Sequence, residues 1–354
     1  MQNIHLQDYS IFIGEVWNEW HKFLKQNTYS KILVLTDENT HQYCFPLLQE
    51  NTPKKELFPI KITSGEQNKG LRTCEQVWAA MLDANVDRKA LMVNLGGGVI
   101  GDMGGFCAST YKRGIDFVQF PTTLLSQVDA SIGGKLGIDF NNIKNSIGVF
   151  RNPQAVFILP QFFDTLPKRE IRSGFAEIIK HSLIADDTEW DKLKEIKDLK
   201  QVQWIDFLYD SLLIKKRVVE IDPFEQGLRK ALNFGHTIGH AVESYFLSTK
   251  APLLHGEAIA IGMICESYLS HKKIDLSKET LHEITDFLLQ IYGHQPIPEA
   301  EFPNLIDMMR KDKKNENNQI NFSLIQPIGK IHINQTAEVS LIEESMVFYN
   351  GLVG

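Results

Sequence analysis

The sequence predicts an α/β N-terminal domain followed by a mainly α-helical C-terminal domain. In the first half, short apolar runs alternate with stretches of helical periodicity. A glycine-rich turn directly follows one of these apolar runs, which is typical of nucleotide-binding α/β folds. After Pro160, apolar residues recur with the period of a helix, and little strand character returns before the C-terminal region. The alternation in the first half predicts a mainly parallel sheet covered on both faces.

In the first half, the apolar run 31–37 is predicted to form a buried strand that ends in a polar turn. Residues 73–84 show helical spacing of apolar side chains, and 90–95 form a second buried strand that leads into three glycines. Two further strands are expected at 117–120 and 155–159, because short runs rich in Val, Phe and Ile are typical of strands.

In the second half, the polar stretch 311–318 is predicted to form a loop. Pro327 and Gly329 separate two short apolar runs, 322–325 and 330–333, which predicts a small β-hairpin. The change of pattern places the domain boundary near residue 160, with an α/β domain at 1–160 and a helical domain at 161–354. Helices are predicted at 171–185, 204–219, 237–247 and 258–270.

The composition is that of a soluble globular protein. The chain has 354 residues, 43% hydrophobic and 23% charged, which is enough to bury a core without disulfides. Its four cysteines are far apart and form no CxxC pair, which argues against a disulfide framework or a structural zinc cluster. The N-terminus lacks the layout of a signal peptide, and no apolar run reaches the roughly 18 residues that span a bilayer. We therefore expect a cytoplasmic protein.

The net charge of −7 makes nucleic acid and anionic membranes unlikely partners, because the protein as a whole repels them. An anionic small molecule would need a local cluster of basic residues. Several Lys and Arg residues do lie in apolar surroundings. Each alone is typical of a surface charge, but gathered around one site they would bind a substrate that carries both phosphate and carboxylate. These residues are Arg113, Lys135, Lys144, Lys180, Arg229 and the run 215–217.

The glycine turn 96–102 follows a strand and opens a predicted helix. Glycines let the backbone approach a pyrophosphate, and the helix N-terminus offers N–H groups to it. The motif alone is equally compatible with a structural turn. The acidic residue expected about 20 positions later would be Asp116, which precedes a strand. Asp37, at the end of the strand 31–37 and close to Asn39, is the better candidate for an adenosine ribose, so a variant Rossmann-like domain is predicted.

The helical half carries candidate metal ligands. His236 and His240 lie four residues apart, on one face of a helix, and His255 adds a third histidine beside a glycine. Glu177 lies in an otherwise apolar helix. Two histidines and one glutamate with an open fourth position are typical of a catalytic divalent metal site, although core or capping histidines remain an alternative. Spacing does not decide whether both His236 and His240 bind metal, or exclude His181.

Several short segments occur in an order that resembles the 3-dehydroquinate synthase family. They span residues 64 to about 314, and the ordered set is far more specific than any one of them. One stretch departs from the family pattern, because Ile143 precedes the Lys144–Asn145 pair where the family usually has a proline–glycine-containing loop. The segments are 64–69, 96–102, 110–114, 121–129, 133–135, 165–180, 225–240 and 255–257.

The resemblance implies that Glu177, His236 and His255 bind zinc or cobalt, and it puts His240 beside the substrate phosphate. It assigns NAD to the domain 1–160, and metal and substrate to the domain 161–354. The residues it assigns to NAD are Asp37, Asn39, Ser64, Gly65, Glu66, Gln67, Asn68, Lys69, Gly98, Val99, Ile100, Gly101, Asp102, Thr122, Thr123, Lys135, Lys144, Phe162 and Thr165.

The resemblance also implies the substrate, 3-deoxy-D-arabino-heptulosonate 7-phosphate, and its conversion to 3-dehydroquinate and phosphate. In the family, NAD oxidises the substrate transiently, phosphate is eliminated, hydride returns, the ring opens and an aldol reaction closes the carbocycle. A homodimer is expected on the same ground, and the polar loop 312–314 resembles a further lysine pair that contacts substrate. The implied catalytic and substrate residues are Lys135, Lys180, Lys215, Arg229, Asn145, Asn233, His240, Asp129, Arg113 and Lys144.

Three alternatives stay open at this point. A metal-dependent polyol dehydrogenase shares this fold and would release NADH, but it gives no role to Lys135, Lys180, Lys215 and Arg229. Another sugar-phosphate cyclase, whose substrate has no carboxylate, is a closer rival. A non-catalytic metal-binding or scaffold protein is the third, although no expected ligand is replaced.

Overall fold

The computed structural model describes residues 1–52, 55–141, 143–311 and 319–352. The chain divides into two compact units, each described by itself below. The first comprises Met1–Ile171 and Gln203–Lys216, and the second Arg172–Val202 and Arg217–Gly354. The first unit thus takes in 203–216, a segment that the sequence pattern groups with the helical half. The functional domains at 1–160 and 161–354 remain predictions, because compact packing alone does not assign a function to either part.

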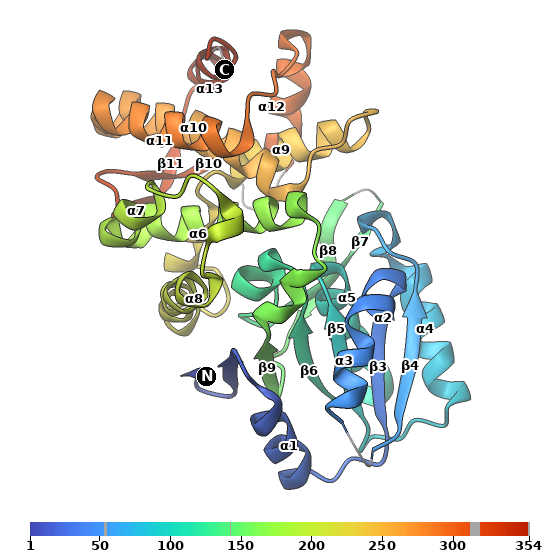
Figure 1. Ribbon diagram of the computed structural model, residues 1–354. Coiled ribbons are helices and arrows are strands. Elements are labelled where there is room, and N and C mark those ends of the chain that lie inside the picture. Colours follow the sequence, from blue (N-terminus) through green and yellow to red (C-terminus); the bar gives the residue numbers. More distant parts are fainter. Residues whose placement is uncertain (53–54, 142, 312–318, 353–354) are drawn as a thin grey trace. The chain divides into compact units, whose positions relative to one another are not determined.

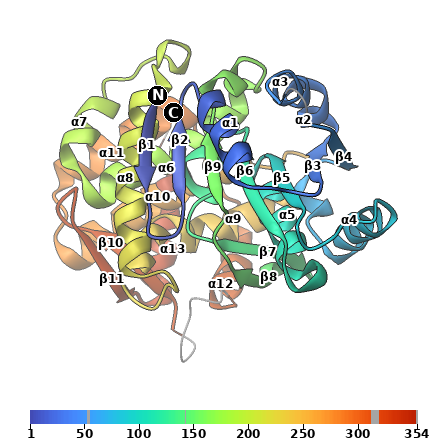
Figure 2. The same cartoon turned by 90° about the horizontal axis from the view of Figure 1, so that it is seen from below.

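The first unit is built on a sheet whose strands run in the order β1-β2-β9-β6-β5-β3-β4. Figure 2 shows them side by side. β1 and β2 are antiparallel, and all other neighbours pair in parallel. The predicted mainly parallel sheet is therefore confirmed. Its strands are β1 (Gln2–His5), β2 (Ser10–Ile13), β3 (Ile32–Asp37), β4 (Leu57–Ile62), β5 (Leu91–Gly96), β6 (Asp116–Pro121) and β9 (Ala155–Ile158).

Helices cover both faces of this sheet (Figure 1). Side chains alternate along each strand, so Leu33 and Leu35 of β3 pack with α4 and α5. Val34, on the opposite face, packs with Trp20 of α1 and with α3. The helices of this unit are α1 (Trp17–Gln26), α2 (Glu38–Tyr43), α3 (Phe45–Glu50), α4 (Leu71–Asp83), α5 (Gly98–Thr110) and most of α8 (Trp204–Ile221), with short turns η1 (Glu66–Asn68), η2 (Tyr111–Arg113), η3 (Ser126–Ala130) and η4 (Pro160–Asp164).

A separate antiparallel hairpin, β7 (Lys135–Phe140) and β8 (Ile143–Phe150), follows the sheet strand β6. Its turn contains the stretch that departs from the family pattern. Among the residues of this stretch that the structure describes, positive φ angles fall on Asn141 (50°) and Asn145 (49°), not on Ile143. Asn tolerates the left-handed region better than a β-branched residue does, so Ile143 can begin β8 without strain.

The second unit is mainly helical, as predicted. The hairpin expected near the C-terminus forms as the antiparallel pair β10–β11. The predicted loop 311–318, with the lysine pair at 313–314, lies almost entirely outside the described residues. The elements are α6 (Lys168–Ala185), α7 (Asp187–Leu193), η5 (Leu199–Gln201), η6 (Leu228–Asn233), α9 (His236–Leu247), α10 (His255–Ile274), α11 (Lys278–Tyr292), η7 (Glu299–Glu301), α12 (Phe302–Arg310), β10 (Asn321–Ile325), β11 (Ile331–Thr336) and α13 (Val339–Asn350).

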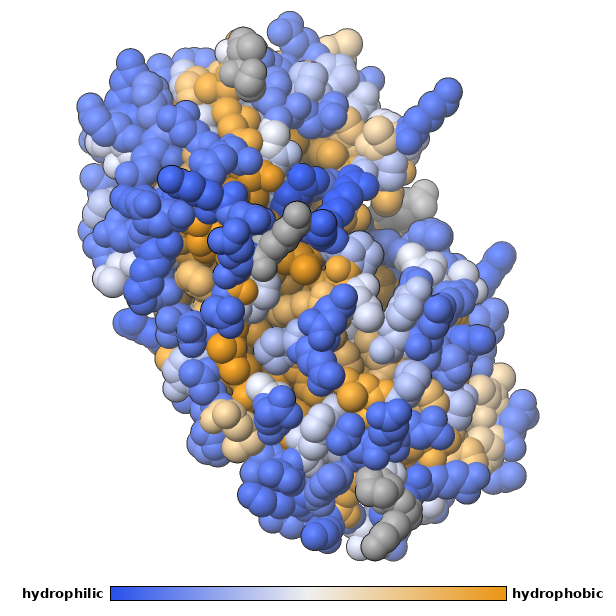
Figure 3. Space-filling view, viewed as in Figure 1, coloured by the Kyte–Doolittle hydropathy of each residue, from blue (hydrophilic) through white to orange (hydrophobic). Residues whose placement is uncertain are grey.

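The surface carries both hydrophilic and apolar side chains. The face in Figure 3 carries hydrophilic side chains over most of its area, with apolar side chains in smaller patches between them. Among the residues that the structure describes, no helix combines the length and the apolar character needed to cross a membrane.

Candidate active site

The glycine turn joins the end of β5 to the start of α5. Gly97 precedes the helix and Gly98 is its first residue. A helix N-terminus presents N–H groups that lack intrahelical partners, together with the positive end of the helix dipole. A Cβ on Gly98 would lie 3.5 Å from Cβ of Ala130, an ordinary contact, and Gly98 has no positive φ. The protein therefore does not need glycine at position 98 for its own packing, and the missing side chain leaves room for a ligand.

Two later glycines of α5, Gly104 and Gly105, are required by close packing instead. A Cβ on Gly104 would lie 2.2 Å from Oδ1 of Asn94, and one on Gly105 would lie 2.4 Å from Cδ2 of Leu136. Both distances are far below van der Waals contact. These glycines let α5 pack directly on the sheet and on β7, which fixes the position of the turn at its N-terminus.

A buried lysine of the first unit joins two of the predicted segments, 64–69 and 96–102, to the Lys144–Asn145 pair. Nζ of Lys69 donates to Oδ2 of Asp102 at 2.7 Å and to Oδ1 of Asn145 at 2.6 Å. Burial alone would lower the pKa of Lys69, but the carboxylates of Asp102 and Glu66 raise it. Lys69 is thus a charged anchor that ties the segment 64–69 to the start of α5 and to β8.

The polar end of β3 lies at the same sheet edge as the glycine turn, because β3 and β5 are parallel neighbours. Asp37 caps α2, and its Oδ1 accepts hydrogen bonds from N and Oγ1 of Thr40. Asn39 is exposed on α2, and the backbone N–H of Ser64 donates to Oε2 of Glu38 at 2.7 Å. This edge therefore brings Asp37, Asn39 and Ser64, three of the residues assigned to a nucleotide, together with the glycine turn.

The other predicted residues of the first unit occupy varied positions. Oδ1 of Asp129 lies 2.5 Å from Nζ of Lys215, and Nζ of Lys144 lies 3.9 Å from Oε1 of Glu66. Arg113 has a φ of 67° and is exposed in η2. Thr122 is buried directly after β6, and the hydroxyl of the next residue, Thr123, forms a hydrogen bond with that of Ser126. Lys135 is the first residue of β7. Phe162 is buried in η4, and Thr165 is exposed just after that turn.

In the second unit, the predicted metal ligands converge. Glu177 lies in the middle of α6, His236 is the first residue of α9 and His255 the first of α10. Oε1 of Glu177 lies 3.3 Å from Nε2 of His236 and 3.6 Å from Nε2 of His255. Within the described parts of the chain, this fully buried oxygen makes no hydrogen bond of proper geometry. Two imidazoles and a buried carboxylate around one point are a donor set that suits a divalent metal.

In both imidazoles, Nδ1, the ring nitrogen that does not face Glu177, lies within hydrogen-bond distance of an oxygen atom. Nδ1 of His236 lies 3.0 Å from the carbonyl oxygen of Phe234, and Nδ1 of His255 lies 3.2 Å from Oε2 of Glu243. A carbonyl only accepts, so Nδ1 of His236 donates and Nε2 faces Glu177. Carboxylates and carbonyls behind imidazoles orient the histidine ligands of metal sites in this way.

The charges at this cluster keep the Glu177 carboxylate ionised. Burial alone would raise the pKa of Glu177, but Lys180 and His236 hold it well below its usual range, so the carboxyl is ionised. Burial would lower the pKa of His255, yet the carboxylates of Glu243 and Glu177 raise it to about 9 in the absence of a metal. The ammonium of Lys180, itself almost fully buried, contacts Oε2 of Glu177.

Two close helix contacts bring the ligands together. A Cβ on Gly256 would lie 1.9 Å from the carbonyl oxygen of Ser173, so the start of α10 presses against α6. The N–H of Gly256 also donates to Oγ of Ser173 at 2.9 Å. A Cβ on Gly262 would lie 1.9 Å from the carbonyl oxygen of Gly235, which brings α10 equally close to the start of α9.

The remaining predicted residues of the second unit surround this cluster or lie just before it in sequence. The ring of His240 is centred 5.1 Å from that of His236 and 5.9 Å from that of His255. His181 is buried one turn after Glu177, outside the trio formed by Glu177, His236 and His255. Arg229 is 2% exposed and donates to the carbonyl oxygen of Pro223 at 2.6 Å, while Nδ2 of Asn233 donates to Oε1 of Glu225 at 3.2 Å.

The sequence reasoning missed several carboxylates near these residues. Glu243 follows His236 by seven residues, two turns along the same face of α9, a signal that could have identified it. Asp222 accepts backbone hydrogen bonds from Gln226, Gly227 and Arg229, and so holds the turn that leads to Arg229. Glu266 interrupts an apolar stretch of α10, which is unusual for a charged residue.

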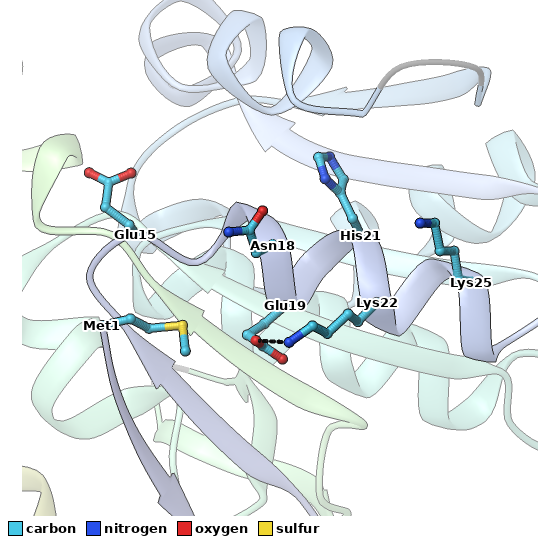
Figure 4. Close-up of a pocket in the computed structure, with 7 residues that line it drawn as sticks. All are labelled: Met1, Glu15, Asn18, Glu19, His21, Lys22 and Lys25. Carbon is cyan, nitrogen blue, oxygen red and sulfur yellow. Dashed lines mark hydrogen bonds and ion pairs between the residues drawn. The ribbon is translucent and has the colours of Figure 1, made fainter.

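A surface hollow along α1 offers no comparable chemistry (Figure 4). Lys22 pairs with Glu19 at 2.7 Å, and Nε2 of His21 bonds to the carbonyl oxygen of Asn51 at 2.8 Å. None of the predicted site residues lines it. The lining residues are Met1, Glu15, Asn18, Glu19, His21, Lys22 and Lys25.

Comparison with known proteins decides the family. The model of the 3-dehydroquinate synthase N-terminal region matches residues 59–173, and that of the 3-dehydroquinate synthase C-terminal region matches residues 174–315. The chain belongs to the 3-dehydroquinate synthase family. A 3-dehydroquinate synthase from Parabacteroides distasonis is 42% identical to it over 347 residues, covering 97% of this chain and 98% of the relative. The resemblance drawn from the ordered segments is confirmed, and with it the enzyme class, a phosphate-eliminating lyase.

Solved structures with the same fold support the architecture of this family member. A 2-deoxy-scyllo-inosose synthase, complexed with carbaglucose-6-phosphate, NAD⁺ and Co²⁺, superposes with a TM-score of 0.87 at 22% identity over 98% of both chains. A 2-epi-5-epi-valiolone synthase from Streptomyces hygroscopicus, with NAD⁺ and Zn²⁺ bound, gives 0.85 at 24% identity, covering 99% of this chain and 98% of its own. The predicted fold class, a Rossmann-like α/β domain with a helical domain, is confirmed.

Proposed function

We propose that the chain converts 3-deoxy-D-arabino-heptulosonate 7-phosphate into 3-dehydroquinate and phosphate, with NAD and a divalent metal as cofactors. The observation that carries the proposal is the convergence of Glu177, His236 and His255 around one buried oxygen, in a member of the 3-dehydroquinate synthase family. The buried cation Lys180 beside this trio distinguishes it from a bare metal site.

Glu177, His236 and His255 would hold the metal, which we take to be zinc or cobalt. The two cyclases with the same fold carry Zn²⁺ or Co²⁺ beside NAD⁺. A bound divalent ion supplies Lewis acidity toward a substrate oxygen. Glu243 and the carbonyl of Phe234 keep both imidazoles turned so that Nε2 faces the site. Glu177 remains anionic because Lys180 and His236 depress its pKa.

The first unit would hold NAD at the edge that contains the glycine turn. The residues 98–102 at the start of α5 suit the pyrophosphate, and Asp37 at the end of β3 suits a ribose hydroxyl. Bound NAD supplies reversible hydride transfer. Lys69 positions the start of α5 through Asp102 and is charged, as its raised pKa indicates. Ser64, Thr122, Thr123, Phe162 and Thr165 stay assigned to the cofactor by the family resemblance.

The substrate would be recognised through its two anionic groups. The protein carries a net charge of −7, so a phosphate and a carboxylate need local cations. Arg suits bidentate contacts with either group, and Lys acts as a compact charge. We assign Lys180, Arg229, Asn233 and His240 of the second unit to the substrate. From the first unit we assign Arg113, Asp129, Lys135, Lys144, Asn145 and Lys215.

A metal-dependent polyol dehydrogenase would use the same glycine turn and the same metal ligands. It would leave the buried Lys180 and Arg229 without a role. The two functions differ in their products, so the test is to incubate the metal-loaded chain with the heptulosonate phosphate and NAD. We expect phosphate and 3-dehydroquinate in equal amounts with no accumulation of NADH. NADH formed in proportion to turnover, without phosphate release, would favour the dehydrogenase.

A homodimer and a cytoplasmic location remain predictions of the family resemblance and the composition. The oligomeric state is accessible to sedimentation equilibrium of the purified chain. A mass of twice the 40.4 kDa of one chain would support the dimer, and a single-chain mass at micromolar concentration would contradict it.

A further inference from the structure

A buried carboxylate outside the ligand set holds the start of the helix that carries His236. Glu266 lies three turns into α10 and is fully buried. Its Oε2 accepts the N–H of Gly235 at 2.7 Å, and its Oε1 accepts those of Thr237 at 3.0 Å and Ile238 at 3.2 Å. These are N–H groups of the kind that a helix N-terminus leaves without partners. Glu266 therefore does from a neighbouring helix what a capping side chain usually does.

No capping side chain fits at the usual position. The residue before α9 is Gly235, with a φ of 77°, a conformation that L-residues with a side chain rarely adopt. A Cβ there would lie 2.5 Å from Cγ of Met263 and 3.2 Å from the carbonyl oxygen of Ile259. The backbone disfavours Ser and Thr at this position, and the close approach of α10 leaves no room for the side chain of any preferred capping residue, Asp and Asn included. The cap has to come from α10 itself.

The capped turn is the one that orients His236. The carbonyl oxygen of Phe234, directly before Gly235, accepts the Nδ1 proton of His236. Glu266 fixes the N–H groups on either side of that histidine, at Gly235 and Thr237. A shift of this turn would move the backbone of His236. It would also move the carbonyl of Phe234, which orients the imidazole ring of His236. Since α10 also begins with His255, one helix carries one imidazole and holds the other in place.

A buried charge is costly unless it is satisfied, and here the backbone satisfies it. Three N–H donors and the positive end of the α9 dipole stabilise the carboxylate. An apolar residue at position 266 would pack with less cost but would leave those N–H groups buried without acceptors. The three hydrogen bonds to the start of α9 therefore explain why a charged residue is buried at position 266.

We propose that Glu266 is a positioning residue for the metal centre: by capping α9 it fixes His236 so that Nε2 faces Glu177. The inference rests on the proposed function, because the metal is the ligand that this arrangement would serve. Residues behind metal ligands typically change metal affinity about 10- to 100-fold when replaced.

The test replaces Glu266 by Gln, which keeps the shape and removes the charge. Asp186→Asn is the matched control, because Asp186 caps α7 in the same unit, accepting from Thr188 and Glu189, and α7 carries no predicted ligand. Metal-free protein would be titrated with Co²⁺ against a competing chelator, with the absorption spectrum of the bound Co²⁺ and the thermal unfolding of the metal-free chain recorded in parallel. We expect Co²⁺ affinity to fall about 10- to 100-fold in Glu266→Gln, with an altered spectrum. Asp186→Asn should keep the affinity and spectrum of the parent chain.

Parent-like affinity and spectrum in Glu266→Gln would overturn the inference. Should that variant not fold, Glu266→Asp retains the charge with a shorter reach, and a parent-like Co²⁺ affinity there would equally contradict the role. Failure of the parent chain to bind Co²⁺ at all would contradict the proposed function. The capping itself is then read from amide hydrogen exchange in the metal-free chain, where Gly235, Thr237 and Ile238 should exchange faster in Glu266→Gln than in the parent. Unchanged exchange would overturn the cap.

Discussion

The glycine turn of the first unit and the metal cluster of the second solve the problem of ligand binding in opposite ways. The turn offers backbone N–H groups at the start of α5, and at Gly98, which we propose to face the cofactor, there is no side chain. The cluster consists of side chains, and each imidazole is held from behind by another oxygen. A backbone site is thus sensitive to added atoms, and a side-chain site to the loss or replacement of one atom.

Gly98 and Gly256 differ in whether the protein's own packing requires the missing side chain. At Gly98 a Cβ would meet its nearest protein atom at an ordinary 3.5 Å, whereas at Gly256 it would lie 1.9 Å from the carbonyl oxygen of Ser173. The packing that brings α10 against α6 explains the second glycine. The protein's own packing does not explain the first, which we propose to face the cofactor. Substitutions at the two positions should therefore affect different properties.

The largest effect is expected from Glu177→Gln, which removes the proposed anionic ligand of the metal. We expect turnover to fall at least about 1,000-fold, since a bound metal supplies several kcal/mol of charge stabilisation, and metal content to fall with it. Lys180 also loses its charged partner, so thermal unfolding of the metal-free variant has to be measured beside activity. Full activity with normal metal content would remove Glu177 from the metal site.

Gly98→Ala tests the backbone site. The added methyl has room within the protein, so the unfolding temperature should stay unchanged, but it would occupy the space of the pyrophosphate. We expect NAD affinity to fall roughly 5- to 150-fold, corresponding to about 1–3 kcal/mol of overpacking. Gly256→Ala is the contrasting variant, expected to lower the unfolding temperature. NAD titration by calorimetry separates the two. Parent-like NAD affinity in Gly98→Ala would show that the cofactor does not approach this residue.

Glu243→Gln is predicted to have a smaller effect on the metal cluster. The amide can still accept a hydrogen bond from Nδ1 of His255 but no longer stabilises the ring by charge. Metal affinity should fall about tenfold, while NAD affinity stays unchanged. Chelator competition measures the first and calorimetry the second. A loss of NAD affinity equal to the loss of metal affinity would contradict a local role.

The smallest effect is expected in the hollow along α1. Lys22 is exposed and pairs with Glu19 within one helix, a contact typically worth about 0–1 kcal/mol. Lys22→Ala should leave turnover, NAD affinity and metal affinity unchanged and shift stability by less than about 1 kcal/mol. A drop in turnover would give this hollow a function that its present chemistry does not suggest.

The central strands were predictable because their signals are local. β3, β5 and β9 are buried and consist mostly of apolar residues, as is typical of buried parallel strands. The strands β1, β2 and β4 escaped because they lie at or next to the sheet edges, where pairing tolerates polar residues and Pro59. The order of the motifs supplied the family and, with it, the proposed metal ligands; in the structure, Nε2 of His236 and Nε2 of His255 lie 3.3 and 3.6 Å from Oε1 of Glu177.

The supporting carboxylates were not predictable, because their partners are distant in sequence or are backbone groups. Glu266 contacts N–H groups about 30 residues earlier, and no residue type marks a backbone donor. Asp222 likewise holds its turn through backbone N–H groups alone. The need for glycine at position 235 is likewise evident only from the structure, in which Met263 and Ile259 of α10 lie close to it. Side chains that bind can be recognised by type, whereas those that position are recognised by what they touch.

The most direct test of the account measures phosphate release from the heptulosonate phosphate by chain that was stripped of metal with a chelator and then supplied with NAD. Without added metal no phosphate should appear, and addition of Zn²⁺ or Co²⁺ should restore release together with 3-dehydroquinate. In the Glu177→Gln variant the same addition should restore little. Phosphate release at the full rate from metal-free chain, or none after metal is restored, would contradict the assignment of Glu177, His236 and His255 as the metal centre of a phosphate-eliminating cyclase.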